Sequence, residues 1–228
     1  MARKKILQKQ VMKNESLSKP KQLIQIFTKA PIPGNVKTRL AREIGAEKAT
    51  ELHISMFEHI LSVSDSLPNA DIEIWHIPAK SHPYFEKLKE LHFTTKQQSG
   101  EDLGDRMIAA IKEGLLNYES IILVGSDCPA ITTKHLKQAF DILTAGYPYT
   151  FIPATDGGFV LIGATEIEEA IFRGVKWGSS DVMNKIEENL ILHEKSYRLL
   201  TPLPDIDRES DLKHIPKLKI FDWRRAEN

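Results

Sequence analysis

Residues 121–129 read Ile-Ile-Leu-Val-Gly-Ser-Asp-Cys-Pro. Four apolar residues in a row are typical of a strand that is buried on both faces of a parallel sheet. Pro129 has no N–H to donate to a strand ladder, so the strand ends before it and Asp127 stands just beyond the carboxyl end. Ligands of open α/β sheets bind in the crevice at that end. This stretch therefore predicts the class of fold and the edge of the sheet that carries the site.

Segments typical of strands and helices alternate on both sides of this stretch. The apolar run 23–27 predicts a strand, and residues 36–61 predict a long helix that is interrupted at Gly45. Further strands are expected at 72–76, 149–152, 159–162 and 197–200, and further helices at 82–91, 105–116, 132–143 and 180–189. The alternation predicts a single-domain α/β fold with a mostly parallel sheet flanked by helices.

Composition indicates one globular domain preceded by a basic extension. The chain has 228 residues, of which 41% are hydrophobic and 27% charged, as in ordinary globular proteins. The 31 basic and 31 acidic residues cancel, but residues 1–21 hold seven basic residues and one acidic residue. A basic tail can contact nucleic acid or anionic lipid, although a solvated extension is the favoured interpretation. We expect residues 1–20 to be a flexible extension and residues 21–228 to be the domain.

The sequence also bears on location and partners. Cys128 is the single cysteine, so an intrachain disulfide and a cysteine-based metal site are excluded. The N-terminus lacks the apolar core of a signal peptide, and no stretch approaches the roughly 18 apolar residues of a membrane span. Aromatic residues, 7% of the chain, are too sparse to indicate a nucleic-acid platform. We expect a cytoplasmic protein without a membrane span or a nucleic-acid partner, and the oligomeric state is left open.

Cations gather where the first predicted strand gives way to a helix. Lys29, Lys37 and Arg39 lie within eleven positions. Helix N-termini attract anions, so cations placed there indicate an anionic ligand such as a phosphate, with a solvated basic face as the alternative. A P-loop would need glycines where Val36 and Pro31 stand. The sequence thus predicts a phosphate site of another kind.

Three carboxylates and one more arginine complete the candidate site. Asp127 could hold Mg²⁺ or Mn²⁺, which prefer oxygen ligands and bridge phosphates, or could form a turn. Asp156 begins an Asp-Gly-Gly sequence that suits a tight hairpin as well as a site. Arg106 could contact phosphate or pair with a carboxylate on its own helix turn. Asp181 lies close to an aromatic residue, Trp177, at a predicted helix start.

A dense acidic run, residues 205–212, has no such local signal. It reads Asp-Ile-Asp-Arg-Glu-Ser-Asp-Leu. Runs of like charge usually stay in water because their burial is costly. Taken without its surroundings, this run is predicted to be a solvated surface.

Taken in order, these segments resemble a known family. The motifs that carry the resemblance are residues 27–40 (Phe-Thr-Lys-Ala-Pro-Ile-Pro-Gly-Asn-Val-Lys-Thr-Arg-Leu), 102–107, 125–129, 156–163 and 177–182. Over about residues 23–212 they match the small bacterial glycosyltransferase-like proteins called DUF2064, some of which are named arsenosugar-biosynthesis glycosyltransferases. That family is similar to the GT-A superfamily of nucleotide-diphospho-sugar transferases, and to molybdopterin and phospholactate guanylyltransferases.

The resemblance implies a metal-dependent glycosyltransferase with a nucleotide-sugar donor and a small-molecule acceptor. Asp127 would hold Mg²⁺ or Mn²⁺, and Lys37 and Arg39 would clamp the diphosphate. Asp156 would lie near the reacting sugar, which makes it the first candidate for the base, with Asp181 second. A nucleotidyltransferase that releases pyrophosphate and a non-catalytic nucleotide-binding regulator stay open as alternatives. The sugar, the base and the acceptor are not specified by the sequence.

Overall fold

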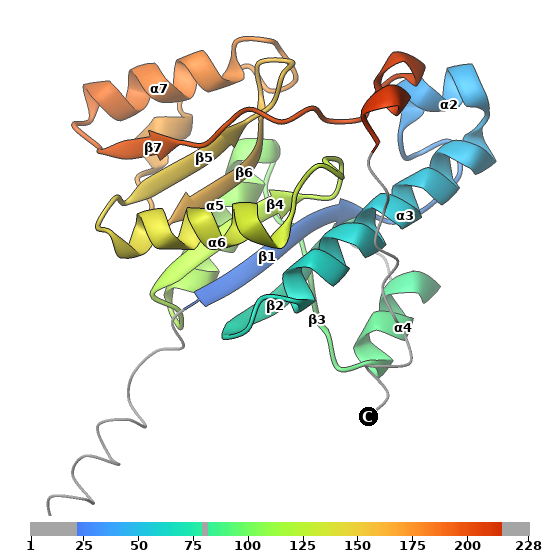
Figure 1. Ribbon diagram of the computed structural model, residues 1–228, viewed down its shortest axis with the longest axis horizontal. Helices are drawn as coiled ribbons and strands as arrows, with labels where there is room; N and C mark the ends of the chain where they lie inside the picture. The colour runs from blue at the N-terminus through green and yellow to red at the C-terminus, as the bar shows by residue number, and fades with distance from the viewer. Residues whose placement is uncertain (1–21, 79–81, 216–228) are drawn as a thin grey trace, which may run out of the picture.

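The structure, a computed structural model, describes residues 22–78 and 82–215. The expected basic extension, residues 1–20, lies outside the described residues. Within them, seven strands form one sheet in the order β3-β2-β1-β4-β6-β5-β7 (Figure 1). The strands are β1 Gln22–Lys29, β2 Ala70–Ile77, β3 Thr94–Gln97, β4 Ser120–Gly125, β5 Tyr149–Pro153, β6 Phe159–Ala164 and β7 Tyr197–Leu199.

Helices connect and cover these strands. They are α2 Thr38–Ile44, α3 Ala46–Asp65, α4 Pro83–Glu90, α5 Leu103–Leu115, α6 Thr133–Thr144 and α7 Val182–Leu192, with the short 3-10 helices η1 Glu169–Phe172 and η2 Glu209–His214. None of the described helices has the length and apolar content that crossing a membrane requires. The predicted α/β fold with a mostly parallel sheet is confirmed.

Most strand pairs are parallel, and β6 is the exception. Pairs β1–β2, β1–β4, β2–β3 and β5–β7 run parallel, whereas β6 runs antiparallel to both β4 and β5. The Asp-Gly-Gly turn at 156–158 reverses the chain directly after β5, so β6 has to return in the opposite direction. The sequence did not predict β3, because Thr94–Gln97 is a short polar strand at the edge of the sheet and lacks an apolar alternation.

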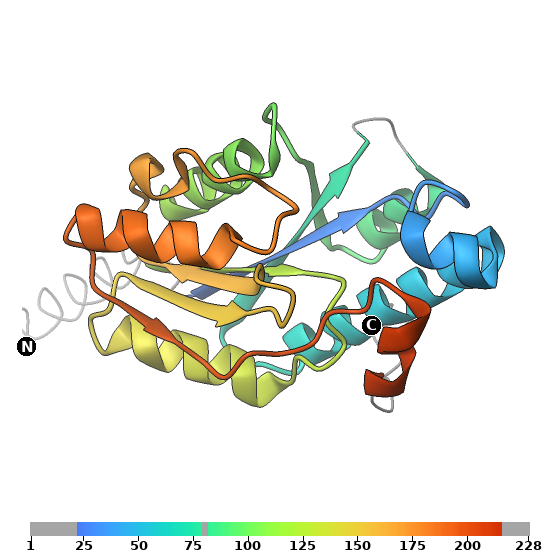
Figure 2. The same ribbon diagram turned by 90° about the horizontal axis from the view of Figure 1, so that it is seen from above.

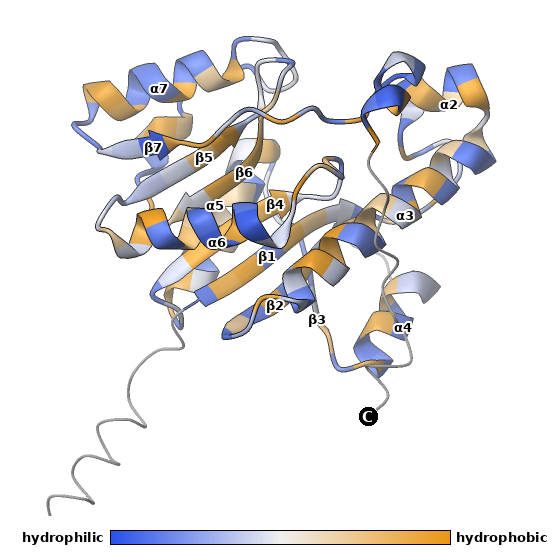
Figure 3. Cartoon of the chain, viewed as in Figure 1, coloured by the Kyte–Doolittle hydropathy of each residue, from blue (hydrophilic) through white to orange (hydrophobic). Residues whose placement is uncertain are grey.

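Two apolar layers enclose the sheet. One face packs against α3, α4 and α6, and the other against α5, α7 and η1 (Figure 2). Since successive side chains of a strand point to opposite faces, Ile24 and Ile26 enter the first layer while Leu23 and Phe27 enter the second. Burial of each such side chain contributes about 1.5–3 kcal/mol. The apolar colouring of β1 and β4 in Figure 3 marks the centre of this three-layer arrangement.

The predicted long helix is two helices. Gly45 separates α2 from α3 with a φ of 92°, and its N–H still closes the last turn of α2 on the Ala41 carbonyl. The interruption at Gly45 is confirmed. The start is later than predicted, since α2 begins at Thr38 after Lys37, which adopts the left-handed conformation with φ 47° and ψ 45°.

The register of β1 and β4 aligns their carboxyl ends. Phe27 pairs with Gly125 in the parallel ladder, and the Ser126 N–H donates to the Phe27 carbonyl over 3.1 Å. Lys29, the last residue of β1, and Asp127, in the loop after β4, therefore lie at the same edge of the sheet. This is the edge at which the sequence places a ligand.

Candidate active site

A cavity of about 400 Å³ opens over the carboxyl ends of β1 and β4. The loops after β1, β4 and β5 line it, together with α3, the start of α5 and the segment that follows β7. Five residues predicted from the sequence are among its lining: Lys29, Lys37, Arg106, Asp127 and Asp156. Arg39 and Asp181 are not among the lining residues.

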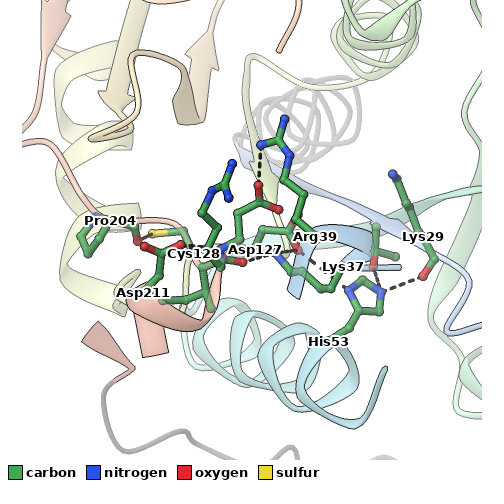
Figure 4. Close-up of polar contacts among 12 residues, drawn as sticks. Lys29, Lys37, Arg39, His53, Asp127, Cys128, Pro204 and Asp211 are labelled. Atoms are coloured by element: carbon green, nitrogen blue, oxygen red, sulfur yellow. Dashed lines mark hydrogen bonds and ion pairs between the residues drawn. The ribbon is translucent and has the colours of Figure 1, made fainter. Parts of the chain in front are cut away.

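Lys37 and Asp127 form an ion pair at this cavity (Figure 4). The Lys37 ammonium lies 2.9 Å from Asp127 Oδ1 and also donates to the carbonyl of Ile206. The Lys37 side chain is only 4% exposed. Lys37 is the N-cap residue of α2, and its left-handed backbone places it outside the helix. Lys37 therefore neutralises Asp127 in the structure described here.

Asp127 is a carboxylate that faces the cavity. Its side chain is 55% exposed, and the residue is part of the cavity lining. Removal from bulk water would raise its pKa. The charge of Lys37, with the hydrogen bond and charge of His53, outweighs that effect and holds the pKa of Asp127 well below its usual range. The group is therefore anionic at any physiological pH.

His53 is a site residue that the sequence did not predict. It comes from α3 and is buried, with Nε2 3.0 Å from the Lys29 carbonyl oxygen and Nδ1 3.9 Å from Asp127 Oδ1 (Figure 4). It thus connects the end of β1 to the loop after β4. A single histidine on an amphipathic helix carries no local motif, so only the three-dimensional arrangement reveals it.

The prediction of a solvated surface for the acidic run 205–212 is wrong at its beginning. Ile206 is fully buried, and its N–H donates to the Asp127 carbonyl over 3.1 Å. This anchor places Asp205 and Asp207 in the cavity lining. Burial and the neighbouring charge of Asp156 raise the pKa of Asp205, and the charge of Asp127 adds to the effect. A cluster of carboxylates, only partly compensated by cations, therefore faces the cavity.

Of the remaining predicted cations, Arg39 and Arg106 have partners within the protein. Arg39 lies 2.6 Å from the Asp207 carboxylate, and both groups are exposed to solvent. Arg106 donates to the carbonyls of Gly100 and Glu101, so it braces its own loop through the backbone and at the same time lines the cavity. The ammonium of Lys29 extends away from the Lys37–Asp127 pair (Figure 4).

Asp156 both stabilises the hairpin turn and lines the cavity, the two roles that the sequence allowed. Its Oδ1 accepts a 3.0 Å hydrogen bond from the Gly158 N–H, which stabilises the β5–β6 turn, and the residue also lines the cavity. Asp181 occupies the N-cap position of α7, where its carboxylate accepts from the Asn184 amide over 3.0 Å.

Burial raises the pKa of the Cys128 thiol to about 12, which leaves it too weakly acidic for a nucleophile.

The turn at Asp156 packs against the segment before α7, and this contact is testable. We expect Gly157→Ala to lower the free energy of unfolding by about 1 kcal/mol more than Gly146→Ala does. Both glycines have positive φ, 94° and 95°, so both variants carry similar backbone strain. A Cβ at Gly157 would lie 2.0 Å from the Ser180 carbonyl oxygen, whereas one at Gly146 meets nothing within 4 Å. Urea unfolding measures both, and equal losses would contradict this packing.

The carboxylates suit a divalent cation that binds together with a phosphorylated ligand. Among residues 22–78 and 82–215, no group of three or more His, Cys, Asp or Glu side chains is arranged to hold a metal ion. Asp127 and Asp205 nevertheless face one cavity and interact electrostatically. Mg²⁺ is commonly held by one or two carboxylates, with waters and substrate phosphates as its other ligands. The donor set therefore fits a metal that shares its coordination with a diphosphate.

The sheet order and the cavity at its carboxyl edge define the class: the protein has the α/β fold of the nucleotide-diphospho-sugar transferases. A protein of Desulfovibrio desulfuricans G20, provisionally named a nucleotide-diphospho-sugar transferase, has a TM-score of 0.78 and 27% identity, with 90% of this chain and 94% of that chain covered. The chain belongs to the DUF2064 family, "Uncharacterized protein conserved in bacteria", whose sequence profile matches residues 61–179. The resemblance stated from the motifs is thereby confirmed.

More distant structures share the fold alone. The 4-diphosphocytidyl-2C-methyl-D-erythritol synthase of Anaerococcus prevotii DSM 20548 has a TM-score of 0.56 at 8% identity, over 84% of this chain and 93% of that chain. A cytidylyltransferase of Leptospira borgpetersenii serovar Hardjo-bovis (strain JB197) has a TM-score of 0.51 at 17% identity, over 83% and 78%. No curated protein matches the chain.

Proposed function

We propose that this protein is a metal-dependent transferase that moves a sugar from a nucleotide-diphosphate donor to a small acceptor. The observation that carries the proposal is the Lys37–Asp127 pair in a cavity that also holds Asp205 and two further cations, Lys29 and Arg106. Cations and metal-compatible carboxylates in one cavity suit a diphosphate better than a neutral ligand. The similarity to the Desulfovibrio protein supports the same assignment.

The cations have to bind and orient the donor diphosphate. Lys29 and Arg106 line the cavity from two different elements, the end of β1 and the first turn of α5. Lys37 pairs with Asp127 before a ligand binds, so it is already held next to the metal-compatible carboxylate. Arg39 could reach the diphosphate only after leaving Asp207. A divalent cation on Asp127 and Asp205 would neutralise the charge that develops on the departing diphosphate.

Asp156 is the residue best placed to remove the acceptor proton. It lines the cavity, whereas Asp181 lies outside it and is engaged by Asn184. In the transfer, the acceptor oxygen forms a bond to the anomeric carbon of the sugar while the bond from that carbon to the diphosphate oxygen breaks. The hydroxyl proton passes to the Asp156 carboxylate, and the nucleoside diphosphate leaves.

A nucleotidyltransferase is the second candidate, because the same cations and carboxylates could stabilise attack at the α-phosphorus. The leaving group separates the two reactions. The protein is incubated with a nucleotide sugar and a panel of acceptors in buffer that contains Mg²⁺ and no Mn²⁺. We expect ³¹P NMR to show a nucleoside diphosphate and no pyrophosphate. Pyrophosphate formed in step with product from a nucleoside triphosphate would contradict the proposal. Binding without either product would favour the non-catalytic regulator.

A further inference from the structure

A second cavity, of about 170 Å³, adjoins the first. The two share Asp156 and Phe159 from the β5–β6 turn, and Leu103 from the start of α5. The walls that belong to the second cavity alone are mainly apolar and come from β4, α5, the segment before α7 and the first residue of α7. They include Leu123, Met107, Trp177 and Val182.

Trp177 forms a fixed wall of this cavity. Its ring lies edge-on to Phe159, with the centroids 6.4 Å apart, and tilted against Phe172 at 6.2 Å. Gly104 allows the indole to approach α5, because a Cβ there would lie 2.7 Å from the indole Cζ2 atom. The indole is therefore held between aromatic rings and a helix backbone, which limits its choice of rotamer.

The size and the lining of the cavity identify the kind of group that fits. A protein cavity of about 150 Å³ lined by apolar side chains is large enough for benzene. Leu103 stands where the two cavities meet and is 42% exposed, so its side chain is accessible to a ligand there. A ring-sized apolar group would cover Leu103 and contact Trp177.

We propose that this Trp177 pocket binds a ring-sized, weakly polar body of the acceptor, an aromatic or compact aliphatic alcohol, and presents its hydroxyl to Asp156. The inference rests on the proposed transfer reaction and specifies its acceptor. Asp156 belongs to both cavities, so an alcohol whose body fills the Trp177 pocket has its oxygen next to the donor site. The pocket thereby selects against small polyols, which would leave its apolar walls uncovered.

The nucleobase has a better position elsewhere. A base needs hydrogen-bonding partners for its edge, and Gln98 supplies an amide in the lining of the first cavity. The Gln98 amide is held by donating to the carbonyls of Thr28 and Trp75, over 3.2 and 2.9 Å. Gln98 does not line the Trp177 pocket.

The experiment uses benzyl alcohol as the probe and the indole N–H signal of Trp177 in ¹H–¹⁵N NMR as the readout. The full chain contains three tryptophans, and Trp177→Phe identifies the signal. We expect benzyl alcohol to shift the Trp177 signal with a Kd of about 1 mM, as a ligand of this size allows. Glycerol should leave the signal in place. No shift with benzyl alcohol, or an equal shift with glycerol, would overturn the proposal.

Two leucines at opposite ends of α5 provide a matched pair of variants. Leu103→Asp puts a charge in the pocket mouth, and we expect it to weaken benzyl alcohol binding at least about fivefold. Aspartate is also favourable in the first turn of a helix, so this variant should fold. Leu116→Asp changes the same residue type at a position 72% exposed, away from both cavities, and should alter the Kd less than twofold. Equal effects of the two variants would overturn the proposal.

Three further outcomes separate this inference from the proposed function. If a nucleoside without phosphates displaces benzyl alcohol and shifts the Trp177 signal, the pocket is a base site and the acceptor assignment is wrong. A chain that binds nucleotide but no benzyl alcohol overturns the inference and leaves the proposed function intact. A chain that binds benzyl alcohol but no nucleotide overturns the proposed function and with it the acceptor role of the pocket.

Discussion

Replacing Asp127 by asparagine is expected to weaken the binding of Mn²⁺ in the presence of a nucleoside diphosphate by about 100-fold or more. Loss of a residue that only supports a metal ligand typically costs 10–100-fold, and Asp127 is proposed as a ligand itself. Asparagine keeps the shape and an oxygen but loses the charge. That oxygen can still accept from the Lys37 ammonium, which lies 2.9 Å from it in the native protein, so the fold should be retained.

Electron paramagnetic resonance of free Mn²⁺ measures this loss directly. The control is Asp141→Asn, the same substitution at an exposed position of α6. It should leave Mn²⁺ affinity unchanged, and circular dichroism of both variants reports whether they fold. A folded Asp127→Asn protein with native Mn²⁺ affinity would remove Asp127 as the metal ligand.

Replacing Lys37 by methionine is expected to lower the free energy of unfolding by about 2 kcal/mol at neutral pH. The side chain is 4% exposed, so methionine retains its apolar packing but removes the ammonium that Asp127 and the Ile206 carbonyl share. The loss should be smaller than for a fully buried pair, because Asp127 faces a cavity that admits water. The same variant should also bind nucleoside diphosphate more weakly.

The effect of Lys37→Met should depend on pH in a defined direction. The pKa of Asp127 is lowered in the folded protein, so the pair contributes its stabilisation above the unfolded pKa, about 3.9. That contribution declines as the pH falls below this value toward the folded pKa. The difference in stability between the native protein and Lys37→Met should therefore be constant from pH 7 to about pH 5 and shrink below about pH 4.

Urea unfolding at several pH values provides the measurement. Lys134→Met, at an exposed position of α6, is the matched control and should show little loss at any pH. A difference for Lys37→Met that stays constant down to pH 3, or that is absent at pH 7, would contradict the ion pair.

The sequence predicted the parts of the fold that have strong local signals. The apolar run of β4 and the proline after it located Asp127 at the sheet edge, and the cationic loop after β1 was correctly placed beside it. The edge strand β3 was missed, because Thr94–Gln97 owes its conformation to pairing with β2 and not to its own composition. Local propensity is weak evidence for such short edge strands.

The contacts between the site residues could not be predicted from local sequence patterns. The pairing of Lys37 with Asp127 depends on the parallel register of β1 and β4, which joins residues far apart in sequence. His53 is part of the site because α3 places it against Lys29 and Asp127. The acidic run looked solvated, and it is the burial of Ile206 that draws Asp205 to the cavity. Sequence alone thus predicted candidates, and the fold determines which of them meet.

The binding of nucleoside diphosphates by the native protein tests the central claim most directly. Isothermal titration with ADP, CDP, GDP and UDP, each with Mn²⁺ and with EDTA, compares the same site with and without metal. We expect at least one of the four to bind with Mn²⁺ and to bind at least about tenfold more weakly with EDTA, since Asp127 and the diphosphate would share the metal. Failure of all four to bind, or equal affinity with Mn²⁺ and with EDTA, would contradict a metal-dependent diphosphate site at the carboxyl ends of β1 and β4.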